Sequence, residues 1–326
     1  MAKKRRSKHS KKMSKKKKVI LGILATFLVL ILASYGGVYW YTHSLINKME
    51  KVEINKENIG IDESLSEYND KITNIALFGI DAEDGNLGRS DSIMIATIDN
   101  NNKKLKLTSI LRDSYVAIDG HGKDKINHAY AFGGPELAIS TLNKNFKLNI
   151  DDFVAVNFTS LPKIIDALGG IELDIDNEEL GYINNKNGTS SKNISRVGNQ
   201  HVDGNQALAY CRIRYTSGGD QKRTERQREV LSKLFEKVST QSITSLPSLL
   251  DVVLPMVQTS MKSSEILALG SEVLKMGIPN IEQQRFPLDN YSSGQMINGI
   301  YYMTYDNEAT INQIRDYIFE DKITWK

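Results

Sequence analysis

Arginine and aspartate side chains suited to phosphate chemistry occur in three groups along this sequence. The first group holds Asp81, Arg89 and Asp91, and the second is the pair Arg112 and Asp113. The third group lies much later and consists of Arg212, Arg214, Asp220, Arg223, Arg226, Gln227 and Arg228. A guanidinium group can donate two parallel hydrogen bonds to phosphate oxygens, and carboxylates hold the divalent cations that phosphates bring. The three groups predict a pyrophosphate site.

Asp81 and Asp91 are the candidate metal ligands. Asp81 ends one buried-type strand and Asp91 begins the next, so the two carboxylates could share one divalent cation, with water and phosphate as further ligands. We expect Mg²⁺, or Mn²⁺ in its place. The alternative is that the two are solvated loop carboxylates or cap a turn.

Arg212 and Arg214 lie two residues apart in a segment, 209–215, that we predict to be a strand. Both side chains would then point to one face of the strand and repel each other unless an anion lay between them. We expect them to meet Arg89 and Arg112 across such an anion. An edge strand with two solvated charges is the alternative.

The last residues of the third group open a long predicted helix after Gly218 and Gly219. Helix N-termini attract phosphate, which favours an anion contact for Arg223, Arg226 and Gln227. Asp113 and Asp220 are the candidates for accepting a proton from the attacking group.

Other polar residues add to the predicted site or are excluded from it. Lys125 and Asn127 could contact phosphate or metal-bound water, whereas His128 is more typical of a structural residue. The single cysteine, Cys211, is expected to be a buried small residue and not a nucleophile. The order of Ser, His and Asp residues and the spacing of possible zinc ligands match no covalent or zinc hydrolase.

The N-terminus predicts a membrane anchor. Residues 3–18 hold eleven Lys and Arg and no acid, and 19–41 is a stretch of 23 residues without a charge. A helix of that length spans about 35 Å, enough for a hydrocarbon core of about 30 Å. The positive-inside rule places the basic tail, 1–18, in the cytoplasm and the residues after the span outside the cell. A cleaved signal peptide is the alternative.

The overall charge of +3 comes from this tail. Without its eleven positive charges, the part predicted to be outside has a net charge of −8. Such an acidic domain argues against nucleic-acid binding.

Residues 42–71 are polar and are expected to form a stalk or accessory segment, and the main domain is expected at 72–326. Apolar runs and turn residues predict strands at 75–80, 92–99, 105–111, 153–158, 171–175, 209–215, 283–286 and 299–303. Helices are predicted at 135–146, 161–168, 223–238 and 310–319, with a turn into a short helix at 203–208 and two more helices within 245–276. The mixture predicts an α/β domain with α-β-α layers around a central mixed sheet.

Taken in order, the motifs resemble those of the LytR-CpsA-Psr family of Gram-positive bacteria. The resemblance covers about residues 72–240 and rests on Asp81, 88–92, 112–116, 125–130, 167–170, 203–210, 212–214, Asp220, Arg223 and 226–227. One departure is Leu111, where the family commonly has proline.

The resemblance implies a membrane-bound phosphotransferase. It would move a teichoic acid, capsular or other secondary wall polysaccharide from an undecaprenyl pyrophosphate carrier to a peptidoglycan hydroxyl, thought to be the C6 hydroxyl of N-acetylmuramic acid. It implies Mg²⁺ at Asp81 and Asp91 and an apolar pocket for the polyprenyl tail, with 161–168 and 230–238 as candidate lining. It also implies phosphate contacts from Arg89, Arg112, Arg212, Arg214, Arg223 and Gln227.

Three alternative functions use the same residues. The first is a hydrolase that cleaves the lipid-linked pyrophosphate with water. The second is a membrane-bound regulator, although a cytoplasmic tail of 18 residues is too short for a promoter-binding module. The third is a polyprenyl-phosphate binding protein without turnover, which the full set of carboxylates and arginines disfavours.

Overall fold

The computed structural model describes residues 41–82, 87–186, 193–214, 219–241, 246–277 and 281–325. The chain divides into two compact units, Met1–Ile46 and Asn47–Lys326, and the second is the domain considered below. Among the described residues, no helix combines the length and hydropathy that crossing a membrane requires. The predicted tail and all but the last residue of the predicted span lie outside them.

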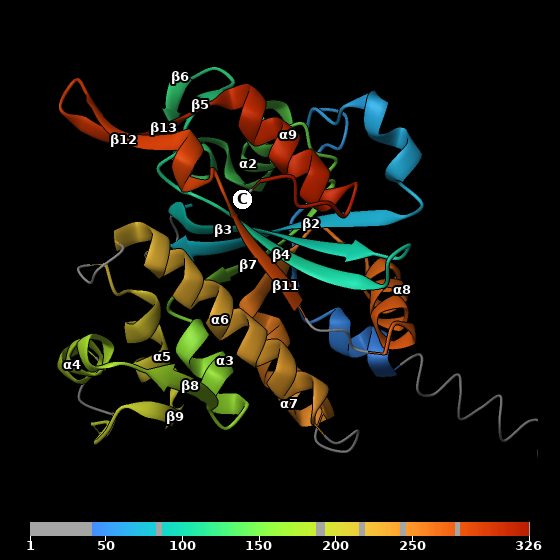
Figure 1. Ribbon diagram of the computed structural model, residues 1–326. Helices are drawn as coiled ribbons and strands as arrows, with labels where there is room; N and C mark the ends of the chain where they lie inside the picture. Colours follow the sequence, from blue (N-terminus) through green and yellow to red (C-terminus); the bar gives the residue numbers. More distant parts are fainter. Residues whose placement is uncertain are drawn as a thin grey trace, which may run out of the picture. The chain divides into compact units, whose positions relative to one another are not determined.

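The strands are β1 (Glu50–Lys51), β2 (Ile72–Asp81), β3 (Arg89–Asp99), β4 (Lys104–Ile110), β5 (Tyr115–Ile118), β6 (Gly122–Lys125), β7 (Asp152–Asn157), β8 (Ile171–Ile175), β9 (Gly198–Val202), β10 (Val257–Thr259), β11 (Ile281–Phe286), β12 (Ser292–Ile297) and β13 (Ile300–Tyr305). The strands β2 to β6 follow one another along the chain, and helices separate the later strands except β12 and β13 (Figure 1).

The α-helices are α2 (His128–Phe146), α3 (Leu161–Ala167), α4 (Asn177–Lys186), α5 (Gly204–Cys211), α6 (Gly219–Ser239), α7 (Leu246–Val253), α8 (Ser263–Lys275) and α9 (Asn307–Ile318). Short 3₁₀ helices are η1 (Glu63–Tyr68), η2 (Leu254–Met256) and η3 (Asp289–Tyr291).

A mixed sheet forms the centre of the domain. Within the described residues it has seven strands in the order β1-β10-β7-β2-β3-β4-β11. The pairs β2/β3 and β3/β4 are antiparallel, whereas β7/β2 and β4/β11 are parallel. The predicted hairpin of residues 92–99 and 105–111 is therefore confirmed as β3 and β4.

Helices cover both faces of this sheet. On one face α2 and α9 pack over β2, β3 and β4 around buried residues such as Ile95, Ile139, Phe146 and Ile314. On the other face lie α6, α3 and α7 (Figure 1). The predicted α-β-α layering around a mixed sheet is confirmed.

Most of the segment 42–71, expected to be a stalk or accessory segment, contributes to the same sheet and core from residue 47 on. Glu50 and Lys51 pair in parallel with β10. Ile59, Leu65 and Tyr68 are buried in the cluster that also holds the residues of β2. The packed domain thus begins before Ile72.

A satellite layer is built from α4, α5 and the two-stranded sheet of β8 and β9, with its own apolar cluster. The predicted strand 171–175 exists, but it pairs with β9 and not with the central sheet.

The predicted strand 209–215 is wrong over the residues that the structure describes. Residues 209–211 end helix α5, and Arg212 caps it with helical φ and ψ. The cause lies at the other end of the helix, where Asp203 and Gln206 form a reciprocal capping box that satisfies free backbone N–H groups. Arg212 and Arg214 therefore do not share a strand face.

Candidate active site

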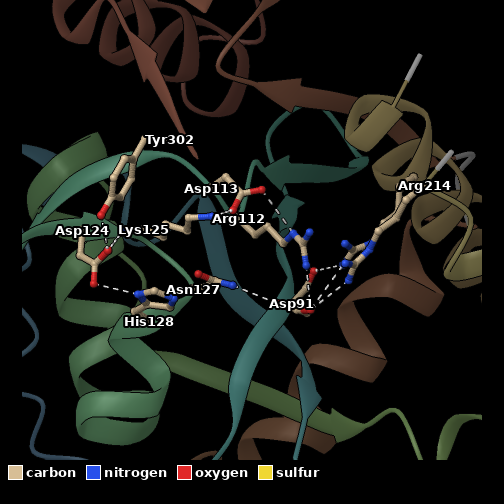
Figure 2. Close-up of polar contacts among 10 residues, drawn as sticks. Asp91, Arg112, Asp113, Asp124, Lys125, Asn127, His128, Arg214 and Tyr302 are labelled. Atoms are coloured by element: carbon tan, nitrogen blue, oxygen red, sulfur yellow. Dashed lines mark hydrogen bonds and ion pairs between the residues drawn. The ribbon is translucent and has the colours of Figure 1, made fainter. Parts of the chain in front are cut away.

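Asp91 is the centre of the polar site. Its carboxylate accepts a hydrogen bond from Arg112 Nη1 at 2.7 Å and another from Asn127 Nδ2 at 2.9 Å. Nη2 of Arg214 lies 3.5 Å from Asp91 Oδ2, and Nη2 of Arg223 lies 3.9 Å from the same oxygen. Asn127 and Arg214 reach the carboxylate from opposite sides (Figure 2). Three arginines from distant parts of the sequence thus converge on one aspartate.

A break in strand register accompanies Asp91. Gly79 pairs with Ser92 and Ile80 pairs with Ser90, so Asp91 is the extra residue of a β-bulge between β2 and β3. Bulges interrupt the alternation of side chains and re-aim one of them, often beside an active site. The Asp91 side chain is 5% exposed, and Arg223 Nη2 also donates to its backbone oxygen at 2.7 Å.

The charge of Asp91 is set by two opposing effects. Burial raises the pKa of its carboxyl, but Arg112, Arg223, Asn127 and Arg214 together outweigh burial and hold the pKa below its usual value. Asp91 is therefore a carboxylate at neutral pH.

Asp81 and Arg89 are more exposed than Asp91. The Asp81 side chain is 52% exposed, and its Oδ1 lies 3.9 Å from Arg212 Nη2. Arg89 is its partner in the β2/β3 register and is exposed. Arg212 also lies over the ring of Phe158, at 6.0 Å. Five arginines and two aspartates thus gather at this end of β2 and β3, which leaves an excess of positive charge.

Arg112 is held by the turn that follows β4. The N–H of Leu111 donates to the oxygen of Phe286 at 2.9 Å and joins this turn to the end of β11. A proline at position 111 could not donate this bond. The N–H of Asn127 donates to Arg112 O at 3.2 Å, which brings the start of α2 to the same place.

Asp113 and Lys125 form a pair next to Arg112. Lys125 Nζ lies 2.7 Å from Asp113 Oδ1, and Arg112 Nε lies 3.5 Å from Asp113 Oδ2 (Figure 2). Lys125 and Asn127, predicted phosphate contacts, are thus within the network that surrounds Asp91.

The polar side chains of helix α6 face different parts of the domain. Arg223 and Gln227, one turn apart, face the sheet, where Arg223 reaches Asp91 and Gln227 lines the cavity described below. Arg228 is buried against β4, and its Nη1 donates to Ser109 Oγ at 3.0 Å. Burial lowers its pKa to about 10.

The position of Arg226 differs from the predicted one. Arg226 was expected to contact pyrophosphate, but it is buried between α6 and α4, where its Nε donates to Glu179 Oε1 at 2.7 Å. Its guanidinium also lies over the Tyr210 ring at 5.7 Å. Arg226 is held in an ion pair that joins α6 to the satellite layer.

Asp220 and Cys211 are two further residues for which the sequence made a prediction. Asp220, a candidate proton acceptor, lies in the first turn of α6, but its side chain falls outside the described part of the structure. Cys211 is buried, and burial raises the pKa of its thiol to about 12. This agrees with the expectation that Cys211 is not a nucleophile.

An apolar cavity of about 250 Å³ adjoins the polar site. Its lining comes from the sheet, from α3 and from α6, and includes Leu77, Met94, Val154, Leu161, Ile164, Val230, Leu231 and Leu234. Ser92, Cys211 and Gln227 also line it. Ser92 follows Asp91 in the chain, Cys211 precedes Arg212, and Gln227 lies one helical turn from Arg223. From the two helix segments predicted to line an apolar pocket, 161–168 and 230–238, the residues that line this cavity are Leu161, Ile164, Val230, Leu231 and Leu234.

The oxygen atoms around Asp91 suit a hard cation. Mg²⁺ is usually held by one or two carboxylates together with water and phosphate. Asn127 Oδ1 is buried beside Asp91 and accepts no hydrogen bond from the described residues, so it could accept one from a metal-bound water. Among the described residues, no group of three or more His, Cys, Asp or Glu could hold a metal alone. A cation here would depend on phosphate oxygens from the ligand.

A second hydrogen-bonded network, which was not predicted from the sequence, lies beside the network around Asp91. His128 Nδ1 lies 2.8 Å from Asp124 Oδ2, and the hydroxyl of Tyr302 donates to Asp124 Oδ1 at 3.2 Å (Figure 2). Asp124 lies in β6 and His128 begins α2, so their contact depends on the turn between the two elements. The contribution of Tyr302 depends on tertiary structure and had no local signal.

Comparison with known proteins identifies the family. The model of the LytR_cpsA_psr family matches residues 37–317. The chain belongs to the LytR-CpsA-Psr family. The match extends well beyond the motif region at 72–240 and takes in the whole of the predicted accessory segment, 42–71, and the late strands.

Curated relatives are similar over nearly their whole length. The chain is 32% identical over 306 residues to the polyisoprenyl-teichoic acid–peptidoglycan teichoic acid transferase TagU of Enterococcus faecalis, covering 91% of this chain and 95% of that one. It is 33% identical over 298 residues to the TagU of Bacillus anthracis, covering 88% and 92%. These names support the transferase class that the resemblance implied.

Solved structures of the family share this fold. The TagV structure of B. subtilis matches with a TM-score of 0.62 and 29% identity, covering 77% of this chain and 96% of that one. A structure described as TagT bound to LIIa-WTA matches with a TM-score of 0.63 and 26% identity, covering 77% and 91%. The α/β fold with a central mixed sheet is thus that of the LytR-CpsA-Psr family.

Proposed function

We propose that this LytR-CpsA-Psr protein transfers a phosphate-linked glycopolymer, such as a teichoic acid or a capsular polysaccharide, from undecaprenyl pyrophosphate to a hydroxyl group of peptidoglycan. The observation that carries this proposal is the convergence of Arg112, Arg214 and Arg223 on Asp91 beside an apolar cavity. A ligand with a pyrophosphate head and an apolar tail matches both parts.

The charge at the site favours a polyanionic ligand. Among the described residues, Asp91 and Asp113 face three guanidinium groups and the ammonium group of Lys125, which leaves positive charge in excess. Two like charges about 4 Å apart repel by about 4 kcal/mol at the effective dielectric constant of a protein surface. Arg89 and Arg212 add further positive charge near Asp81. A pyrophosphate would remove this repulsion and accept bidentate hydrogen bonds from the arginines.

In the proposed reaction an acceptor hydroxyl oxygen attacks the phosphorus atom that carries the glycopolymer. A new P–O bond forms to the acceptor, the bond to the bridging oxygen of the pyrophosphate breaks, and polyprenyl monophosphate leaves. The proton of the hydroxyl passes to a carboxylate, for which Asp113 and Asp220 are the candidates. Positioning and charge neutralisation supply most of the catalysis in phosphoryl transfer, and arginines provide both.

The cavity is the proposed place for the polyprenyl chain. Its apolar lining between the sheet, α3 and α6 would remove isoprenoid surface from water at a gain of about 25 cal/mol for each Å² buried. Gln227 and Ser92 would then mark the boundary between the tail and the pyrophosphate.

Asp91 and Asp81 are the residues that would hold a Mg²⁺ or Mn²⁺ ion. A bound cation would neutralise part of the charge on the pyrophosphate oxygens.

For the cellular location, we propose a single membrane span at 19–41 with the tail, 1–18, in the cytoplasm and the domain outside. The asymmetry of Lys and Arg around the apolar stretch supports this topology.

The proposal is tested with a lipid-linked pyrophosphate donor carrying a labelled polymer, the detergent-solubilised full chain and purified peptidoglycan. We expect label on the peptidoglycan and release of polyprenyl monophosphate. Arg112→Lys keeps the charge but loses the forked geometry, and we expect the rate to fall by about a hundredfold or more. Lys233→Met, which removes a partly exposed charge paired with Glu236 on the same helix, is the matched control and should leave transfer unchanged.

Release of free labelled polymer at the same rate with and without peptidoglycan would indicate a hydrolase. Tight binding of the donor without any product would indicate a binding protein. Either outcome rules out the proposed transfer.

A further inference from the structure

The hairpin of β12 and β13 projects from the body of the domain (Figure 1). Residues 290–305 contain no charged side chain, although a quarter of the chain is charged. Met296, Ile300, Tyr301 and Tyr291 on or beside this hairpin are 67%, 50%, 43% and 39% exposed. Exposed apolar and aromatic residues that lie together mark an interaction surface. Met296 and Tyr301 are cross-strand partners and share one face of the hairpin, whereas Ile300, next to Tyr301 in β13, points to the other face. We call Met296 and Tyr301 the hairpin surface.

The base of the hairpin is attached to the candidate active site. The N–H of Met303 donates to Asp113 O at 2.8 Å, and Met303 also bridges to Ser114. Lys125 Nζ, which pairs with Asp113, lies 5.9 Å from the ring centre of Tyr301. The hairpin surface therefore begins where the pair of Asp113 and Lys125 lies, within reach of a molecule that approaches the proposed transfer site.

An open polar hollow of about 410 Å³ lies at the base of the hairpin, lined by 290–293 and 304–306. Most of its side chains are amides, hydroxyls and phenol rings, and Asp306 is the only charged one. Hydroxyl and amide groups donate and accept hydrogen bonds with uncharged polar ligands. The hollow and the hairpin surface together offer hydrogen bonds and aromatic faces with little charge.

The ring of Tyr301 packs against the neighbouring strand of the hairpin. It lies across Gly294 on that strand, so close that a Cβ built on Gly294 would be 2.6 Å from the ring. The φ angle of Gly294 is not positive, so the backbone alone would tolerate alanine. Glycine at this position therefore serves to make room for the ring.

We propose that the hairpin surface and the hollow hold the acceptor glycan, an uncharged run of N-acetylated sugars, while its hydroxyl meets the donor. The inference rests on the proposed function and adds a binding site for the second substrate. Tyr, Ser, Asn and Gly are residues that recognition surfaces use, because rigid amphipathic rings and small polar groups bind at low entropic cost. Sugar rings present apolar faces to tyrosine and hydroxyl and N-acetyl groups to amides.

A glycan fits this hairpin better than a lipid bilayer does. Within the described residues β12 and β13 form a sheet of two strands, which leaves backbone N–H and C=O groups along its edges. Such groups cost several kcal/mol each when they are unsatisfied in hydrocarbon. A glycan can satisfy them. The absence of Lys and Arg from 290–305 also removes the usual attraction to anionic lipid.

The test is binding of the full chain, in detergent, to peptidoglycan sacculi stripped of anionic polymer, measured by co-sedimentation. We expect Tyr301→Ala to weaken binding by about tenfold or more, as for aromatic residues that dominate interfaces. Gly294→Ala, which displaces the ring without removing it, should weaken binding in the same direction. Leu274→Ala, a change at a 69% exposed residue on α8, is the matched control and should bind as the unmodified protein does.

A second readout separates this inference from the proposed function. Inorganic pyrophosphate should raise the melting temperature of the Tyr301→Ala protein as much as that of the unmodified protein, because only the glycan subsite has changed. Transfer by Tyr301→Ala should then show a raised KM for peptidoglycan. If the unmodified protein transfers no label at all, the proposed function fails, whatever the hairpin binds.

Three results would overturn the inference. The first is that Tyr301→Ala and Gly294→Ala bind sacculi and transfer polymer as the unmodified protein does. The second is that the two variants lose binding to glycan-free lipid vesicles and retain binding to sacculi, which would make a bilayer the partner. The third is that sedimentation velocity shows self-association that only the variants lose, which would make a second copy of the chain the partner.

Discussion

The contrast between Asp91 and Asp81 gives the sharpest test of the site. Both were predicted as metal ligands, but their surroundings differ. Asp91 is 5% exposed and lies 2.7 Å from Arg112, with Arg214 and Arg223 close by. Asp81 is 52% exposed and lies 3.9 Å from Arg212. Replacing each by asparagine keeps the size of the side chain and removes its charge.

The expected effects follow from burial. Removing one member of a buried ion pair costs about 3–5 kcal/mol, since the remaining charge stays in a poorly solvated place. An exposed pair contributes less than about 1 kcal/mol. Because 1 kcal/mol shifts the melting temperature of a domain of this size class by about 2–4 °C, we expect Asp91→Asn to lower it by about 6–20 °C and Asp81→Asn by no more than about 4 °C.

The assay is thermal unfolding of the full chain in detergent at pH 7, without divalent cations or phosphate, followed by circular dichroism. Excluding these ions ensures that stability and not ligand binding is compared. If the two variants melt within about 2 °C of each other, the convergence of arginines on Asp91 does not stabilise the domain. That result would also remove the main argument for an anion site at this position.

Three further outcomes are expected. Because the pKa of folded Asp91 is held below its ordinary value of 3.8, its contribution is present above that pH and is lost as the pH falls through the folded value. The difference in melting temperature between the unmodified protein and Asp91→Asn should therefore be full at pH 6 and shrink below about pH 4, and a difference that grows on acidification would contradict this. Glu179→Gln, which removes the buried partner of Arg226, should cost about 3–5 kcal/mol in urea unfolding, whereas Glu225→Gln in the exposed pair with Lys222 should cost less than about 1 kcal/mol. Cys211, with its pKa raised to about 12, should resist iodoacetamide at pH 8 in the native protein and react in 6 M guanidinium, as mass spectrometry would show.

Short-range patterns in the sequence predicted the frame of the domain well. The apolar run at 75–80 and the alternation at 92–99 identify β2 and β3, since side chains in strands repeat with a period of two. The apolar positions of 223–238 identify α6. These patterns depend on one element and its nearest face, and such information is contained in the local sequence.

The prediction for 209–215 failed because two local signals competed. Alternating apolar residues suggested a strand, but the capping box of Asp203 and Gln206 starts a helix that continues through Cys211. Capping hydrogen bonds satisfy backbone groups that a strand would have to satisfy through neighbours. A turn into a short helix at 203–208 was predicted, and the error was to end that helix before Ala209.

Local patterns in the sequence did not predict which residues the charged side chains contact. On α6 the spacing shows that Arg223 and Gln227 share a face and that Arg226, three residues after Arg223, lies next to it. It does not show that Glu179, 47 residues earlier, meets Arg226. Likewise no glycine or proline at 90–92 announces the bulge at Asp91, which arises from the register of β2 against β3.

The way the central sheet is assembled has a consequence for synthesis and folding. One end of the sheet is made by β1 at residues 50–51, which pairs with β10 at 257–259, and the other end is made by β11 at 281–286. Contacts between residues so distant in sequence slow folding, because a long loop must close before they form. A nascent chain that has reached residue 250 still lacks the strand that covers β7. Its half-built sheet would expose unpaired strand edges, so molecules at this stage depend on being kept apart from one another until the last seventy or so residues have emerged.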